Sequence, residues 1–153
     1  MKCLISYYTY SGNTEEVAEL IRENLERYGI DVTMNVMGLG KYEEPSEYDV
    51  VFFGSFTWDY GMVPDEIKDH IQEIGYKPDN MAIFGTGDTQ FGGDEMFCRA
   101  VDKLVNFYKS KWDGLKIEQS PRGQQEIKIV NWVDTILEDM GFIVPLRNTG
   151  TEH

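Results

Sequence analysis

The chain has 153 residues, which is enough for one domain with a full hydrophobic core and too few for two ordinary domains. Its 14 basic and 27 acidic residues leave a formal charge of −13, which argues against nucleic acid or an anionic membrane as a partner. No stretch approaches the roughly 20 apolar residues that span a bilayer, and the N-terminus carries no secretory signal pattern. We therefore expect a cytoplasmic protein with one site, whose acidic surface suits a partner with a basic face.

Cysteine and histidine give no pattern for a metal site. Cys3 and Cys98 are far apart, form no CxxC motif and lie in apolar surroundings, so we expect both to be reduced core residues. His70 is expected on a polar-leaning face of a helix, and His153 falls in the polar tail. With no histidine pair and no cysteine cluster, no metal is predicted.

The first two predicted elements are a strand and a helix. Apolar residues from 3 to 8 predict a buried strand. From 15 to 28, apolar side chains recur at the spacing of a helix with one buried face, and Gly29 ends this segment. Glu15 and Glu16 fall in the first turn of this helix, where acidic side chains favour the positive end of the helix dipole. The residues between the two elements therefore lead into a helix N-terminus.

This connecting turn, Thr-Tyr-Ser-Gly-Asn-Thr at residues 9–14, is a candidate anion site. Backbone N–H groups at a helix N-terminus lack acceptors and carry the positive end of the dipole, and three hydroxyls add further donors. No Lys or Arg occurs between Lys2 and Arg22, so an anion would be held by neutral donors. The alternative is that Ser11 or Asn13 only caps the helix.

The rest of the chain continues the alternation of strands and helices. Short apolar runs predict strands buried on both faces, and helical apolar spacing predicts the segments between them. Alternation repeated about five times predicts a parallel sheet with helices on both faces, in one domain over residues 1–144 with a polar tail over 145–153. The further expected strands are 30–37, 50–53, 81–84 and 115–117, and the further expected helices are 64–74, 97–108 and 129–140.

The loops after the third and fourth strands have features that suit a flat ligand. Residues 54–62 carry Trp58 between glycines, where its ring is placed to stack on a planar heterocycle; the alternative is that Trp58 folds back as a loop anchor. Residues 85–94 are rich in glycine, which permits close backbone approach, and Phe91 is placed to cover the opposite face of the same ring. Ligands of such sheets bind beyond the carboxyl ends of the strands, where the strand order reverses. The two loops and the turn at 9–14 therefore predict one site.

Other nucleotide motifs fail in this chain. The Gly-Thr-Gly sequence at 85–87 is a fragment of a dinucleotide fingerprint, but Gln90 stands where the third glycine belongs. No GxxxxGK(S/T) motif occurs, which excludes ordinary P-loop chemistry. The predicted ligand is therefore a planar heterocycle with an anionic group, bound without either motif.

The residues at 9–14 also match the flavodoxin phosphate-loop pattern (S/T)-x-(S/T)-G-x-T. Together with Ser-Phe-Thr-Trp at 55–58 and Gly-Thr-Gly-Asp at 85–88, in the right order after the right strands, they make the chain resemble a flavodoxin over nearly its whole length. The short segment near 115–119 leaves no room for the insertion of long-chain members, so the resemblance is to the short-chain class. It implies a doubly wound, five-stranded parallel sheet of order 2-1-3-4-5, with FMN at the switch point as a known property of that fold.

The resemblance also assigns roles to loop residues. The turn at 9–14 would hold the FMN phosphate, Trp58 would stack on one face of the isoalloxazine, and the loop with Phe91 would cover the other face. Many relatives have glycine directly after the tryptophan, where this chain has Asp59, so we expect weaker stabilisation of the half-reduced flavin. The implied FMN-binding residues are Thr9, Tyr10, Ser11, Gly12, Asn13, Thr14, Ser55, Phe56, Thr57, Trp58, Asp59, Gly61, Gly85, Thr86, Gly87, Asp88 and Phe91.

By this resemblance the chain is a low-potential one-electron carrier with no catalytic residues of its own. A flavodoxin-reductase-type donor would supply electrons, and a metalloenzyme or radical enzyme with a basic docking face would accept them. The alternatives are a quinone reductase or a ribonucleotide-reductase maturation flavoprotein of the same fold, and a binding module without flavin. The short length gives no added segment for a quinone pocket or a dimer interface, so we expect a monomeric carrier.

Overall fold

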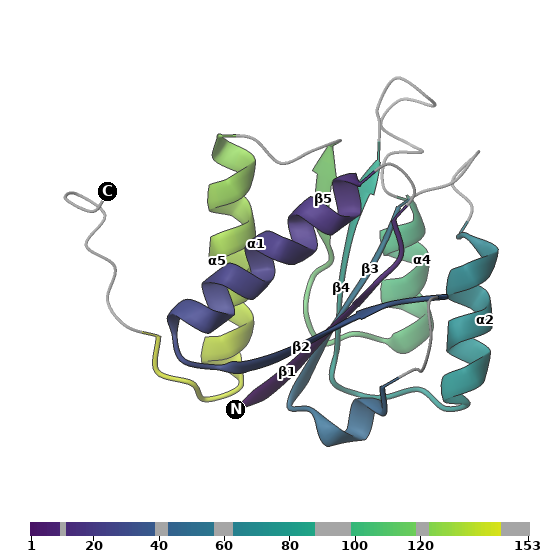
Figure 1. The fold of residues 1–153 in the computed structure, drawn as a ribbon, viewed down its shortest axis with the longest axis horizontal. Coiled ribbons are helices and arrows are strands. Elements are labelled where there is room, and N and C mark those ends of the chain that lie inside the picture. The colour runs from purple at the N-terminus through teal and green to yellow at the C-terminus, as the bar shows by residue number, and fades with distance from the viewer. Residues whose placement is uncertain (10–11, 39–42, 57–62, 88–98, 119–122, 145–153) are drawn as a thin grey trace.

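The structure is a computed structural model in which residues 1–9, 12–38, 43–56, 63–87, 99–118 and 123–144 are described. Five parallel strands form one sheet in the order β2-β1-β3-β4-β5, with helices on both faces (Figure 1). The expected fold class and strand order are thereby confirmed. The strands are β1 (Lys2–Tyr7), β2 (Asp31–Val36), β3 (Val50–Phe56), β4 (Met81–Gly87) and β5 (Leu115–Glu118). The helices are α1 (Asn13–Arg27), α2 (Asp65–Ile74), α4 (Arg99–Tyr108) and α5 (Gln124–Asp139), and a short 3-10 turn, η1, spans Pro45–Glu47.

The two faces of the sheet bury different side chains. Helices α1 and α5 lie on one face, and α2 and α4 lie on the other (Figure 1). Ile5, Phe52 and Phe84 belong to the core under α1 and α5. Leu4 and Phe53, one residue away along the same strands, belong to the core under α2 and α4. Because the central strands are buried on both faces, their sequences are continuous apolar runs.

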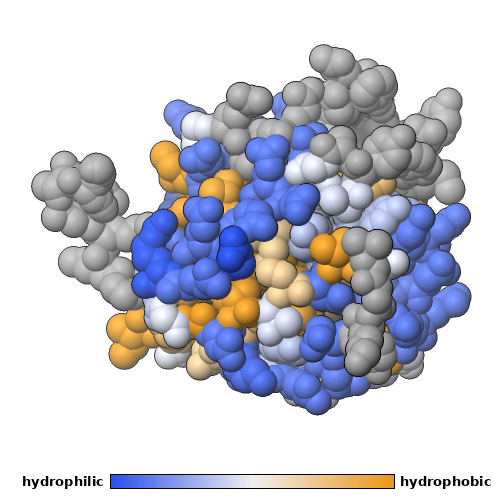
Figure 2. Space-filling model, viewed as in Figure 1, coloured by the Kyte–Doolittle hydropathy of each residue, from blue (hydrophilic) through white to orange (hydrophobic). Residues whose placement is uncertain are grey.

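Hydrophilic residues cover much of the described surface on one face of the molecule (Figure 2). Figure 2 shows hydrophilic residues over the exposed sides of α1 and α2. Both helices carry two acidic residues in the first turn and a stripe of buried residues on the side that faces the sheet. None of the described helices is long and apolar enough to cross a membrane.

Two glycines lie inside strands at positions where the sequence predicted strand ends. β3 continues past Gly54 and β4 continues past Gly85, so the loops expected from residues 54 and 85 begin later than predicted. A Cβ atom on Gly54 would lie 2.2 Å from the ring of Phe84, and one on Gly85 would lie 2.6 Å from the carbonyl oxygen of Ser55. Glycine is needed at both positions because the Phe84 ring and the Ser55 backbone already fill the space of a side chain. The strand ends predicted at residues 53 and 84 were therefore wrong.

Helix boundaries also differ from those expected. Pro64 was predicted as a first helical residue, but its φ of −58° and ψ of 148° are extended, and α2 begins at Asp65. α5 begins at Gln124 rather than at 129. The apolar spacing did not reveal the first turn and a half of this helix, because these residues are mostly exposed and carry no apolar stripe. The expected start of the helix at 97 lies outside the described residues.

Cys3 is a core residue, as expected from the sequence. It is fully buried with a free thiol, and burial raises the pKa of this thiol to about 12. The thiol therefore stays protonated and unreactive at neutral pH, because the thiolate is the nucleophilic form. Cys98 lies outside the described residues, so its expected place in the core stays a prediction.

Tyr108, which is buried, and Tyr28, which is half-buried, differ in the hydrogen bonding of their hydroxyl groups. Tyr108 is 5% exposed and packs against the ring of Phe53, and its hydroxyl has no hydrogen-bond partner in the part of the chain that the structure describes. The Tyr28 hydroxyl donates to Oδ1 of Asp134 at 2.9 Å, and the same oxygen accepts from Nδ2 of Asn24 at 3.1 Å. Asp134 thereby joins α1 to α5.

Replacing Tyr108 with Phe should raise the free energy of unfolding by about 1 kcal/mol, because the variant no longer buries an unbonded hydroxyl. Tyr28→Phe is the matched control and should lower the free energy of unfolding by about 1 kcal/mol, since Asp134 loses a donor. Urea denaturation of both variants beside the wild type measures the two effects. Changes of the same sign in the two variants would contradict this account of the hydroxyls.

Candidate functional site

The carboxyl ends of β1, β3 and β4 meet at one edge of the sheet. Tyr7 near the end of β1 pairs with Gly54, and Phe56 at the end of β3 pairs with Thr86. After β1 the chain moves outward to β2 on one side, and it then returns to β3 on the other side of β1. The strand order therefore reverses between β1 and β3, which is the usual place for a ligand in such sheets.

A tight turn leads from β1 into α1. The backbone N–H of Gly12 donates to Oγ1 of Thr9 at 2.9 Å, and Gly12 has a left-handed conformation with a φ of 96°. Gly12 occupies the position before the helix, so Asn13 is the first helical residue rather than its cap. No described side chain caps this helix end, and Ser11 lies outside the described residues. The turn depends on glycine because a residue with a Cβ is strained at this φ.

The start of α1 offers donors to an anion. Its first backbone hydrogen bond runs from the N–H of Glu16 to the carbonyl of Gly12 at 3.0 Å, so the N–H groups of Thr14 and Glu15 have no acceptor inside the helix. Among the described residues, nothing lies within 4 Å of the place that a Cβ of Gly12 would take. This open space and the positive end of the helix dipole suit a phosphate group held by neutral donors.

Thr14 is the second residue of α1, and its side chain faces the sheet. It is the first residue of a buried stripe that continues through Val17, Ala18 and Ile21. Its hydroxyl oxygen lies 2.8 Å from that of Thr86 in β4, and the two residues are 1% and 2% exposed. The turn before α1 is therefore tied to the end of β4 by a buried hydrogen bond.

The end of β3 is tied to α2 through Tyr8. The ring of Phe56 stacks on the ring of Tyr8, with centroids 5.7 Å apart and planes inclined by 27°. Burial, and next a hydrogen bond to the carboxylate of Glu66 in the first turn of α2, raise the pKa of Tyr8. Neither Tyr8 nor Glu66 was predicted as an FMN-binding residue: Tyr8 was expected in the first strand, and Glu66 was expected on an acidic helix face, either solvated or used for docking. The apolar run that ends at Tyr8 was the one feature of the sequence that placed Tyr8 at the end of the first strand, next to the site.

The structure brings together the predicted FMN-binding residues that it describes. They lie in the turn before α1, at the start of that helix, or at the ends of β3 and β4, all at the same edge of the sheet. These residues are Thr9, Gly12, Asn13, Thr14, Ser55, Phe56, Gly85, Thr86 and Gly87. The others lie outside the described residues and stay predictions: Tyr10, Ser11, Thr57, Trp58, Asp59, Gly61, Asp88 and Phe91.

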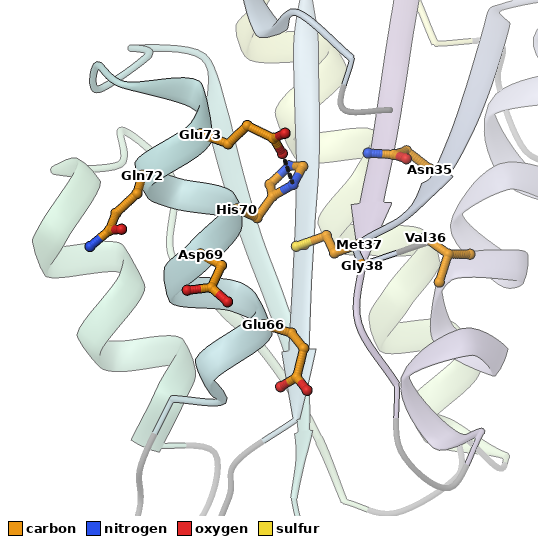
Figure 3. A pocket seen from close by; sticks show the side chains of 9 residues that line it. All are labelled: Asn35, Val36, Met37, Gly38, Glu66, Asp69, His70, Gln72 and Glu73. Atoms are coloured by element: carbon orange, nitrogen blue, oxygen red, sulfur yellow. Dashed lines mark ion pairs between the residues drawn. The ribbon is translucent and has the colours of Figure 1, made fainter. Parts of the chain in front are cut away.

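A hollow of about 540 Å³ lies between the end of β2 and helix α2 (Figure 3). In this view the ring of His70 points from α2 toward the carboxylate of Glu73, to which a dashed line joins it, and Met37 lies below the ring. The residues that the structure describes contain no group of three or more His, Cys, Asp or Glu side chains that could hold a metal ion. The hollow is lined by Asn35, Val36, Met37, Gly38, Glu66, Asp69, His70, Gln72 and Glu73.

His70 was expected on a polar-leaning helix face, and this expectation was wrong. Its side chain is 6% exposed, and its ring centroid lies 6.0 Å from that of Phe53. The buried side of α2 runs through Ile67, His70 and Ile74, so the helix turns His70 toward the sheet, while Ile71 is only partly buried. Burial lowers the pKa of His70 from its ordinary value of 6.5, and the carboxylate of Glu73, with Oε1 4.0 Å from Nδ1, acts in the opposite direction.

The lowered pKa of His70 predicts a loss of stability on mild acidification. Below pH 6.5 the unfolded chain binds a proton at His70 that the folded chain resists, so stability falls until the pH reaches the folded-state pKa. Urea midpoints measured at several values between about pH 7.5 and pH 5 should therefore fall more in the wild type than in His70→Gln. Glu73→Gln is the control, because removing the carboxylate lowers the pKa of His70 further and should extend the fall to lower pH. Parallel pH profiles for the wild type and His70→Gln would refute this prediction.

Known proteins share this architecture. A solved structure of oxidised Flavodoxin 2 from Bacillus cereus aligns over 91% of this chain and 99% of its own, with a TM-score of 0.78 and 32% sequence identity. A short-chain flavodoxin associated with a bacterial microcompartment aligns over 92% of this chain and 99% of its own, with a TM-score of 0.81. Its 21% identity shows a shared fold alone.

Sequence comparisons lead to the same group. The chain is 35% identical over 140 residues to a Bacillus subtilis (strain 168) protein named "Probable flavodoxin 2", covering 86% of this chain and 91% of that protein. It is 32% identical over 142 residues to the flavodoxin of Maridesulfovibrio salexigens, covering 86% and 93% of the two chains. The family model described as Flavodoxin matches residues 5–112. The chain therefore belongs to the flavodoxin family of FMN-binding electron-transfer proteins.

Proposed function

We propose that this chain is a low-potential one-electron carrier that binds FMN at the carboxyl edge of the sheet and passes electrons from a reductase to a metalloenzyme or radical enzyme. The observation that best supports this is the start of α1 at the switch point, where backbone donors and the hydroxyls of Thr9 and Thr14 adjoin a place with no described residue within 4 Å of the Gly12 Cβ position. Bound FMN supplies the one-electron chemistry. The residues of the chain bind the cofactor, orient it and limit the access of water to it.

The proposed phosphate site uses neutral donors only. The N–H groups of Thr14 and Glu15 precede the first helical hydrogen bond of α1, so they are available to a phosphate oxygen. The Thr9 hydroxyl accepts a hydrogen bond from Gly12 and keeps its own hydrogen for a ligand. The ring is proposed to lie between the loops that follow β3 and β4, with Trp58 and Phe91 as the stacking side chains.

The proposed partners have a basic docking face. A second hollow, of about 390 Å³, begins at Gly12 and is lined by Leu20 and the acidic residues Glu15, Glu16, Glu19, Glu23 and Glu126. Together with the formal charge of −13, this surface would raise the encounter rate with a basic partner. The same charge opposes the negative charge that full reduction adds to the flavin, which lowers the potential of that step. A monomer located in the cytoplasm is part of the proposal.

Stepwise reduction of the purified protein, loaded with FMN and monitored by absorbance, tests the proposal. We expect one bound flavin per chain and reduction at low potential, with slow turnover of NADPH and quinone unless a reductase is added. Fast turnover without a reductase would assign the chain to the quinone reductases instead. Failure to bind FMN would instead indicate that the chain is a binding module that does not use flavin. Electron transfer to a ribonucleotide reductase subunit in preference to other acceptors would favour the maturation protein.

Gly12→Ala should weaken FMN binding by about tenfold, because a side chain strains the left-handed turn and enters the open space beside it. Gly123→Ala is the matched control. Gly123 also precedes a helix with a positive φ, of 54°, and nothing in the described chain lies within 4 Å of its Cβ position. Each substitution should cost about 1 kcal/mol of stability, but only the first should raise the dissociation constant for FMN. Titration by flavin fluorescence measures the affinities, and equal effects of both variants would argue against a phosphate at this turn.

A further inference from the structure

The hydroxyl pair of Thr14 and Thr86 suggests a role for Thr86 that differs from direct contact with the cofactor. We infer that Thr86 is a positioning residue for phosphate binding, which acts by holding Thr14 and the first turn of α1 in place. This rests on the proposed function, because it concerns how the same site is held together. It also distinguishes Thr86 from the strand-end residues that would contact the ring.

The geometry of the pair carries the inference. Thr14 and Thr86 are 72 residues apart in the sequence, yet their hydroxyl oxygens lie 2.8 Å apart, and both residues are almost fully buried. Thr86 pairs in register with Phe56 of β3, so β4 is separated from β1 by a whole strand. The start of α1, which follows β1, thereby reaches across β3 to bond with β4. Displacement of α1 along the sheet would break this bond in a buried place, where an unbonded hydroxyl is costly.

Counting hydrogens shows how the pair can serve a phosphate. Each hydroxyl has one hydrogen, and the contact between the two oxygens uses only one of them. A phosphate dianion accepts hydrogen bonds and donates none. If Thr86 donates to Thr14, the hydrogen of the Thr14 hydroxyl is left for an acceptor at the turn. If Thr14 donates to Thr86, that hydrogen is already used and cannot reach a ligand. For Thr14 to donate to a phosphate, Thr86 must therefore be the donor within the pair.

Riboflavin provides the decisive comparison, because it has the ring system and side chain of FMN but lacks the phosphate. If Thr86 acts through Thr14 on the phosphate, its loss should affect FMN and leave riboflavin nearly unaffected. If Thr86 contacts the ring instead, its loss should affect both ligands equally. A role in folding alone should change the stability of the protein and neither affinity.

The experiment measures the dissociation constants of FMN and riboflavin for the apoprotein and its variants. Thr86→Val keeps the shape of the side chain and removes the hydroxyl, and Thr86→Ser keeps the hydroxyl. We expect Thr86→Val to raise the dissociation constant for FMN about tenfold and that for riboflavin by less than about twofold, with Thr86→Ser close to the wild type. Thr86→Ala provides the same loss of hydroxyl if the valine variant does not fold.

A double substitution shows whether Thr86 acts through its partner. The double variant Thr14→Val, Thr86→Val should bind FMN no more weakly than Thr14→Val alone. The reason is that Thr86 acts on the phosphate only through the Thr14 hydroxyl, which the first substitution has already removed. Equal losses for FMN and riboflavin, or an unchanged FMN affinity in Thr86→Val, would overturn the inference while the wild type still binds FMN. A wild-type protein that binds no FMN would overturn the proposed function, and this inference with it.

Discussion

Burial of the central strands on both faces is the constraint on which the rest of the structure depends. Helices cover β1, β3 and β4 from both sides, so the interior of these strands must be apolar. Buried hydroxyls such as Ser55 and Thr86 occur only near the strand ends in the described parts of β3 and β4. There Ser55 donates to the carbonyl of Phe56 at 2.7 Å, and Thr86 bonds to Thr14. The buried hydroxyls of β3 and β4 therefore lie at one edge of the sheet.

The fold could be predicted from the sequence because its main signals are local. Apolar runs and helical spacing are read within ten to fifteen residues, and their alternation is enough to define a parallel sheet. The errors at Gly54, Gly85 and His70 came from long-range packing. Gly54 and Gly85 resemble strand ends, but they continue their strands because Phe84 and Ser55 occupy the space of a side chain. His70 resembles a surface residue, but the rotation of α2 places it against Phe53.

The candidate site could be predicted where one segment contains all of the expected donors. The turn at 9–14 holds hydroxyls, a glycine and a helix start, so six residues are enough to suggest an anion site, which stays a prediction. The supports of this turn come from elsewhere in the chain, and no local pattern pairs Thr14 with Thr86 or Tyr8 with Glu66. These contacts depend on the strand order, which places the end of β4 near the start of α1.

The neutral character of the proposed phosphate site has a consequence for how the chain should respond to ionic strength. Between Lys2 and Arg22 no cationic side chain is present to attract the cofactor, which carries the same sign of charge as a protein of formal charge −13. Dissolved ions screen this repulsion and so favour retention of the cofactor. The same ions would screen the attraction between the acidic surface and the proposed basic partner, and so weaken their association. Cofactor binding and partner docking should therefore respond to salt in opposite directions, so that concentrated salt releases the partner and retains the flavin.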